Sequence, residues 1–134
     1  MNIDDIMDML DWNNPPDVQE KGRMLARKIR CINVFLQPGH LGHCKNVWDN
    51  CAQILSERSD LELRPYFCEL LEWLIDMNWP GAECIFQRLI QFQDTNWFEH
   101  NINECKHEAG VLGEEIWLSN LCKLQEVRKR LDTV

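Results

Sequence analysis

Two histidines and a glutamate recur at helical spacing in the C-terminal third of the chain. His100, Glu104 and His107 lie at positions i, i+4 and i+7, so a helix would place all three side chains on one stripe. Two imidazoles and a carboxylate form a ligand set that suits zinc. This stripe lies opposite the apolar face of the same helix, and a stripe opposite the core is usually solvated. We therefore favour an exposed polar face, with a metal site as the alternative.

A second group of histidines and a cysteine lies in a segment rich in glycine and proline. His40, His43 and Cys44 are three potential ligands and Cys51 would be a fourth, but their spacing matches no known zinc module. A thiol enzyme would need His43 to activate Cys44, and sequence neighbours in a loop seldom face each other. The chain also lacks a nucleophile elbow, a phosphate-binding loop and a dinucleotide-binding glycine pattern. We expect no catalytic residue, no metal and no cofactor.

The third group of residues would form a surface for a partner. Acids alternate with aromatic rings along the helix expected over residues 59–77, and the five residues are Glu62, Tyr66, Glu69, Trp73 and Asp76. Such a surface suits a basic protein, because rings supply contact area and carboxylates orient the partner. The alternative is that the rings pack on neighbouring helices, since a middle helix in a stack is covered on both flanks.

The charge of the chain limits the classes of partner. Its 134 residues include 22 acids and 14 lysines and arginines, which gives a formal net charge of −8. Phosphates would be repelled, so we expect no binding to nucleic acid or to anionic membranes, whereas a basic protein would be attracted. There are seven cysteines, an odd number at wide spacing, and no signal peptide or apolar run of about 18 residues occurs. We expect reduced, mostly buried cysteines in a cytoplasmic protein.

Apolar periodicity predicts helices and no strands. The expected helices cover residues 3–10, 15–30, 45–58, 59–77, 80–92, 97–110 and 114–131. Gly22 interrupts one apolar stripe and suggests a close approach of two helices, and Pro65 should kink the fourth helix or mark its first turn. Gly110 and Gly113 should break the sixth helix, and residues 31–44 form the longest expected connection. The last helix should bury the residues Trp117, Leu121, Leu124 and Leu131. We expect one all-α domain over residues 1–134.

A short pattern recurs between these helices and indicates their arrangement. Residues 11–15 and 76–80 share the pattern D-x-N-x-P, and residues 94–97 repeat its first half as D-x-N-W. Asparagine is a favoured N-cap and proline fits the first helical turn, so each copy predicts a junction between antiparallel helices. Repetition of the junction favours stacked helical hairpins of the HEAT or armadillo kind over a compact bundle.

Three segments of the chain resemble a known family. Residues 70–82 read LLEWLIDMNWPGA, and together with residues 47–56 and 14–20 they resemble an uncharacterised bacterial domain family of unknown function. The resemblance covers about residues 11–92, and its most specific part is the Trp-Pro-Gly block. It implies a HEAT-like helical fold and brings no catalytic residue.

These observations favour a non-enzymatic helical-repeat domain that binds a basic protein. By analogy of architecture with immunity proteins, one candidate partner is a bacterial toxin whose basic active surface the domain would cover. The alternative from a different class is a small enzyme, either metal-dependent through His100, Glu104 and His107 or thiol-based through His43 and Cys44.

Overall fold

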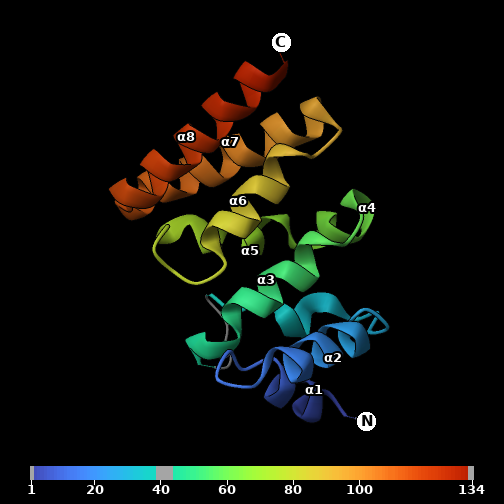
Figure 1. Cartoon of the computed structure of the whole chain (residues 1–134). Helices are drawn as coiled ribbons and strands as arrows, with labels where there is room; N and C mark the ends of the chain where they lie inside the picture. The colour runs from blue at the N-terminus through green and yellow to red at the C-terminus, as the bar shows by residue number, and fades with distance from the viewer. Residues whose placement is uncertain (1, 39–43, 133–134) are drawn as a thin grey trace.

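The chain is helical throughout the part that the structure describes. The computed structural model describes residues 2–38 and 44–132, and no strand occurs among them. This confirms the all-α prediction, and each expected helix has a counterpart. Figure 1 shows an elongated arrangement with α1 and α2 at one end, α3 and α6 in the middle, and α7 and α8 at the other end. Within these described ranges, no helix combines the length and apolar character that crossing a bilayer requires.

The first two helices form a tight hairpin. They are α1 (Ile3–Met9) and α2 (Pro16–Ala26), and they pack against each other. Gly22 lies where they are closest, because a Cβ added there would be only 2.8 Å from the Cβ of Met9. The close approach predicted at this glycine is confirmed.

A buried amide ties the next long helix to this hairpin. The helix is α3 (Trp48–Ser56), and its Asn50 side chain is buried. The Asn50 amide donates to the carbonyl of Leu10 at 2.7 Å, and its oxygen accepts a hydrogen bond from Arg23 at 2.7 Å. Both hydrogen-bonding ends of the amide are thus occupied, as a buried polar group requires.

Two 3₁₀ segments lie in the region expected to be the longest connection. They are η1 (Ile32–Phe35) and η2 (Lys45–Val47). Ile32, Phe35 and Leu36 are buried, so this region contributes a turn of helix to the core. Residues 39–43, which include His40 and His43, lie outside the described part of the chain.

The fourth predicted helix is present but broken into four short segments. These are α4 (Asp60–Leu63), η3 (Arg64–Tyr66), α5 (Phe67–Glu72) and η4 (Trp73–Ile75). Pro65 lies inside η3, at the first break. Proline has no N–H to donate and its ring crowds the preceding turn, so the kink predicted at this residue follows from its chemistry.

Three regular helices complete the fold. They are α6 (Ala82–Ile90), α7 (Thr95–Leu112) and α8 (Glu115–Asp132). The break predicted at Gly113 is confirmed, whereas the break predicted at Gly110 is wrong, because α7 continues through that residue to Leu112. Gly113 ends it instead in a left-handed conformation with φ of 72°, where a glycine carries no steric penalty.

The recurring D-x-N-x-P pattern forms an Asx turn. The Oδ1 atom of Asp11 accepts a hydrogen bond from the backbone N–H of Asn13 at 2.8 Å, and Oδ1 of Asp76 accepts one from the backbone N–H of Asn78 at 2.8 Å. The prediction of asparagine N-caps is wrong, since the N-caps of α2 and α6 are a proline and a glycine. In the third copy Asp94 is itself the N-cap of α7. The pattern nevertheless marks a helix junction in all three places.

Aromatic side chains fill the middle of the molecule. The Trp48 ring meets the rings of Trp73 and Trp79 edge to face, at centroid distances of 6.1 and 5.4 Å. A second cluster packs around the start of α5 and comprises Phe67, Phe92, Trp97 and Phe98. Edge-to-face contacts of this kind stabilise a core beyond the area they bury.

A half-buried ion pair anchors the start of α4 to α6. The Arg88 guanidinium donates to Oδ1 of Asp60 at 2.6 Å, and the backbone N–H of Gln93 donates to Oδ2 at 2.9 Å. Burial alone would raise the pKa of Asp60, but the hydrogen bonds and the positive charge of Arg88 outweigh it. The pKa of this carboxyl therefore lies below its ordinary value of 3.8.

At the two ends of the molecule, helices that are consecutive in the chain pack against each other, whereas in the middle the packed helices are separated in the chain. Consecutive helices pair as α1 with α2 and as α7 with α8, whereas α3 packs on α6, beyond the broken segments. The two terminal pairs agree with the predicted hairpins, and the HEAT-like repeat stays a prediction.

Candidate partner-binding site

Trp73 does not belong to an exposed surface. Its side chain is 0% exposed, and its indole N–H donates to the carbonyl of Pro80 at 2.8 Å. The ring also meets Trp48 edge to face. Its predicted role in partner binding is therefore corrected: Trp73 packs in the core and holds the loop that leads into α6.

The other members of the predicted stripe are accessible but do not share one straight helical face. Glu62 is exposed and closes a capping box with Ser59, whose backbone amide lowers the pKa of the Glu62 carboxyl by donating to it. Tyr66 and Glu69 are half-buried, on either side of the break between η3 and α5. Asp76 follows η4, at the edge of a hollow in the surface. The stripe is split because the helix that was expected to carry it is split.

Two adjacent hollows near this segment have both apolar and charged walls. They have volumes of about 260 Å³ and about 520 Å³, and they share Ile75 and Glu114 as walls. We call them together the acidic–apolar groove. It is lined by Glu72, Ile75, Asp76, Met77, Asn78, Trp79, Glu108, Leu112, Glu114, Ile116, Trp117 and Asn120.

The groove is built from two distant parts of the sequence. One wall is η4 and the loop that follows it, and the other is the turn between α7 and α8. Packing of η4 against α8 and of α5 against α7 brings the two walls together. In Figure 1 the loop before α6 and the turn between α7 and α8 lie on the same side of the molecule. Hydrogen bonds fix this contact, since Trp117 donates to the Leu71 carbonyl at 2.9 Å and Asn120 to the Leu74 carbonyl at 2.7 Å.

The charge of the groove is negative. Four carboxylates and no lysine or arginine are among the described residues that line it. Within residues 2–38 and 44–132, three of the four form no ion pair, namely Asp76, Glu108 and Glu114. The pKa of the neighbouring Cys68 thiol is raised, first because neighbouring atoms partly shield it from water and then by surrounding carboxylates, including Glu72 and Glu108.

Large apolar side chains stand in solvent beside these carboxylates. Leu112 is 62% exposed and Ile116 is 72% exposed, and both line the groove. Val111, which precedes Leu112 in the chain, is exposed as well. Exposed apolar side chains are unremarkable singly, but a cluster rimmed by charge is typical of an interaction site.

The predicted metal-ligand stripe lies in solvent. His100 and Glu104 are in contact, with Nε2 and Oε1 3.2 Å apart, and their side chains are 70% and 68% exposed. His107 is exposed as well. Over the described ranges, no group of three potential ligands has a geometry that could hold a metal ion. The interpretation of this stripe as a solvated face fits its exposure.

The cysteines are less buried than predicted. Cys51 and Cys105 are buried, which raises the pKa of each thiol to about 12. Cys44 is exposed, and its proposed base His43 lies outside the described residues. The exposed thiols are Cys31, Cys44, Cys68 and Cys122, so the expectation of mostly buried cysteines is wrong.

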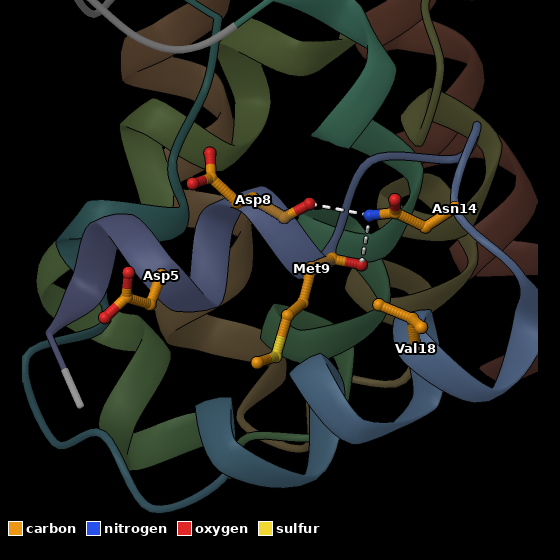
Figure 2. Close-up of a pocket in the computed structure, with 5 residues that line it drawn as sticks. All are labelled: Asp5, Asp8, Met9, Asn14 and Val18. Atoms are coloured by element: carbon orange, nitrogen blue, oxygen red, sulfur yellow. Dashed lines mark hydrogen bonds between the residues drawn. The ribbon is translucent and has the colours of Figure 1, made fainter.

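A further hollow lies beside the N-terminal hairpin. Its volume is about 370 Å³, and it is lined by Asp5, Asp8, Met9, Asn14 and Val18. Figure 2 shows the Asn14 amide bonded to the carbonyls at the end of α1, at 2.7 Å from Asp8 and 3.2 Å from Met9. The Asp8 carboxylate and the Met9 side chain point in different directions there. Its apolar side chains, Met9 and Val18, are half-buried, whereas Leu112 and Ile116 of the acidic–apolar groove are exposed.

Sequence reasoning missed the α7–α8 wall of the groove. It placed the end of a helix at Gly110 and treated the following residues as a break. The available signal was the pair of apolar runs on either side of Gly113, with Val111 and Leu112 before it and Ile116 after it. Leu131, which was predicted to be buried, is 57% exposed in the last turn of α8.

The middle of the chain is similar to a family of unknown function. A family profile described as Domain of unknown function (DUF5071) matches residues 45–109, just under half of the chain. This supports the coarser prediction of an uncharacterised family. The match includes the η4 side of the groove and ends before the α7–α8 turn. No curated protein and no solved structure matches the chain.

Proposed function

We propose that this chain is a non-enzymatic helical domain that binds a protein partner through the acidic–apolar groove. The observation that carries the proposal is the combination of exposed apolar side chains with unpaired carboxylates in one concavity. Apolar contact provides affinity, and complementary charge selects and orients the partner. The fitting partner surface is basic with protruding apolar side chains.

A protein suits the groove better than a small metabolite. Two apolar side chains of the groove, Leu112 and Ile116, are 62% and 72% exposed, and a small ligand would leave much of them in water. A protein surface would cover them and exclude water from the neighbouring carboxylates, which strengthens each charged contact. The net charge of −8 would also accelerate encounter with a basic partner.

Inhibition of a bacterial toxin is the specific role that we infer for such binding. A toxin that acts on nucleic acid needs basic residues to hold phosphates. An acidic domain seated on those residues would exclude the substrate without any chemistry of its own. Co-expression with a toxin encoded by a neighbouring gene should protect cells, and a failure to protect would remove this role while leaving the wider proposal intact.

The wider proposal is tested by a pair of matched variants. Ile116→Lys places a cation on the groove wall, and Leu131→Lys makes the same kind of change at an exposed position near the end of the same helix. Neither side chain is buried, so both variants should keep the helical circular-dichroism spectrum. A partner captured from the source cells is purified, and its affinity for each variant is measured by calorimetry.

We expect Ile116→Lys to weaken binding at least about tenfold, because it places like charges against a basic partner. Leu131→Lys should leave the affinity within about twofold of wild type. Equal affinity of all three proteins for every purified partner would overturn the proposal. The enzyme alternative has its own test: one equivalent of zinc or iron in protein purified without a histidine tag would favour it.

A further inference from the structure

The larger hollow of the groove has the chemistry of a pocket for one cationic side chain. Its volume of about 520 Å³ is in the range of ligand pockets, roughly 300–1,000 Å³. Ile75, Met77 and Ile116 form apolar walls, and the carboxylates of Asp76 and Glu114 lie among them. Apolar walls around charged groups match a guest with a hydrocarbon stem and a charged head.

The two carboxylates are available to a guest. One carboxylate oxygen of Asp76 accepts a hydrogen bond from the backbone N–H of Asn78. Its second oxygen has no hydrogen bond within residues 2–38 and 44–132. Glu114 precedes α8, and its backbone carbonyl accepts from Leu118 while its carboxylate forms no ion pair with a described residue. Asn120 uses its amide N–H on the Leu74 carbonyl, so its side-chain oxygen is a further acceptor at the wall.

A cation of the chain lies over the ring of Trp79, one of the wall residues. The Lys45 ammonium lies 5.9 Å from the Trp79 ring centroid and 5.8 Å from that of Trp48. Lys45 is not among the residues that line the hollow. Because the Lys45 ammonium already occupies one face of the Trp79 ring, we expect the carboxylates to bind the positive charge of a guest. Trp79 would then serve as an apolar wall of the hollow.

Arginine fits this arrangement better than lysine. A guanidinium presents five N–H donors in a rigid plane and can serve several separate acceptors at once, whereas an ammonium is a compact and strongly hydrated point charge. The hollow offers acceptors from Asp76, Glu114 and Asn120 on two different elements. On the premise that the groove binds a protein, we propose that this hollow receives an arginine side chain of the partner as its charged anchor.

The proposal is tested with short blocked peptides and the full-length protein. The probes are N-acetyl-Leu-Arg-Leu-amide, its lysine counterpart, its citrulline counterpart and free L-arginine. Citrulline keeps the shape of arginine and removes its charge. Binding is followed by NMR, through the side-chain amide resonances of Asn78 and Asn120, which lie at the hollow.

We expect the arginine peptide to bind about tenfold more tightly than the citrulline peptide and more tightly than the lysine peptide or free arginine. Asp76→Asn and Glu114→Gln should each weaken its binding about fivefold or more. Glu115→Gln is the matched control, since Glu115 is the adjacent exposed acid and does not line the hollow. It should leave the affinity of the peptide unchanged.

Each contrary result has a distinct meaning. Equal binding of the arginine and citrulline peptides, or equal loss in Glu114→Gln and Glu115→Gln, would overturn the arginine pocket. Free arginine binding as tightly as the peptide would show a site for a small molecule, which also overturns it. If the carboxylate variants bind the purified partner normally while Ile116→Lys does not, the pocket assignment fails and the proposed function stands. If the arginine peptide binds but Ile116→Lys retains every partner, the proposed function fails instead.

Discussion

Replacement of Gly81 by alanine should destabilise the fold severely. Gly81 has φ of 86°, and a Cβ added there would lie 2.6 Å from the Cβ of Ala52 and 2.9 Å from the Trp48 carbonyl oxygen. The left-handed conformation costs an alanine about 1–2 kcal/mol, and overpacking of a filled interior adds about 1–3 kcal/mol. The free energy of unfolding should therefore fall by roughly 2–5 kcal/mol, a large part of the 5–15 kcal/mol typical of a domain.

Two other glycines separate the contributions to this loss. Gly113→Ala keeps the conformational strain, with φ of 72°, but meets no atom within 4 Å, so it should lose only about 1–2 kcal/mol. Gly110→Ala lies within α7 with no atom within 4 Å, and it should gain about 0.5–1 kcal/mol from improved helix propensity. The difference between Gly81→Ala and Gly113→Ala then measures the close packing of the α6 start on α3.

The assay is urea unfolding followed by far-ultraviolet circular dichroism, with midpoint and slope compared among the three variants. The expected order of stability is Gly110→Ala, wild type, Gly113→Ala, Gly81→Ala. If Gly81→Ala is no less stable than Gly113→Ala, the contact of the loop before α6 with α3 is not as close as described. The position of Asp76 and Trp79 in the groove would then lose its support, because this loop carries both.

Three further predictions concern the interior and its charges. Asn50→Ala should lower the free energy of unfolding in urea titrations by about 2–4 kcal/mol, because it leaves the Leu10 carbonyl and Arg23 without their hydrogen bonds. Gln53→Ala, on the exposed side of the same helix, should change it by less than about 0.5 kcal/mol. Because the pKa of Asp60 is lowered in the folded state, its carboxylate contributes stability above its ordinary pKa of 3.8, and this stability is lost as the pH falls through the folded pKa. In Asp60→Asn, thermal stability should therefore fall less steeply below about pH 4 than in the wild type. A parallel loss in both proteins would refute the assignment. Alkylation of the native protein at pH 8 followed by mass spectrometry should spare Cys51 and Cys105, whose thiols have pKa values of about 12, and modification of both before the exposed thiols would contradict their burial.

The apolar faces of the helices were predictable because periodic burial is a local property. Apolar residues at helical spacing are buried in both α6 and α7. They are Ala82, Ile85, Phe86, Leu89 and Ile90 in α6, and Phe98, Ile102, Cys105 and Ala109 in α7. Leu131 shows the limit of this reasoning. Periodicity identifies the apolar face of a helix, but whether another element covers the end of that face depends on tertiary packing.

The error at Trp73 has a geometric cause. The predicted stripe assumed an uninterrupted α-helix, in which each residue advances about 100°. Pro65 breaks the helix once, and the 3₁₀ segment η4 then advances about 120° per residue, so the two ends of the stripe no longer share a face. The hydrogen bond from Trp73 to the Pro80 carbonyl is a contact with the following loop, which helical periodicity does not encode.

The groove was unpredictable for a different reason, and Asp76 shows why. It is the one residue of the predicted stripe that lines the groove, yet it lies in an Asx turn and not on the helical face that suggested it. The turn uses one carboxylate oxygen to shape the loop, and the other accepts no hydrogen bond from a described residue. Its neighbours in the groove, Glu114 and Ile116, are brought there by packing of η4 on α8. The sequence could therefore suggest that Asp76 faces a partner, but the acids and apolar side chains that would bind with it are assembled only by the tertiary fold.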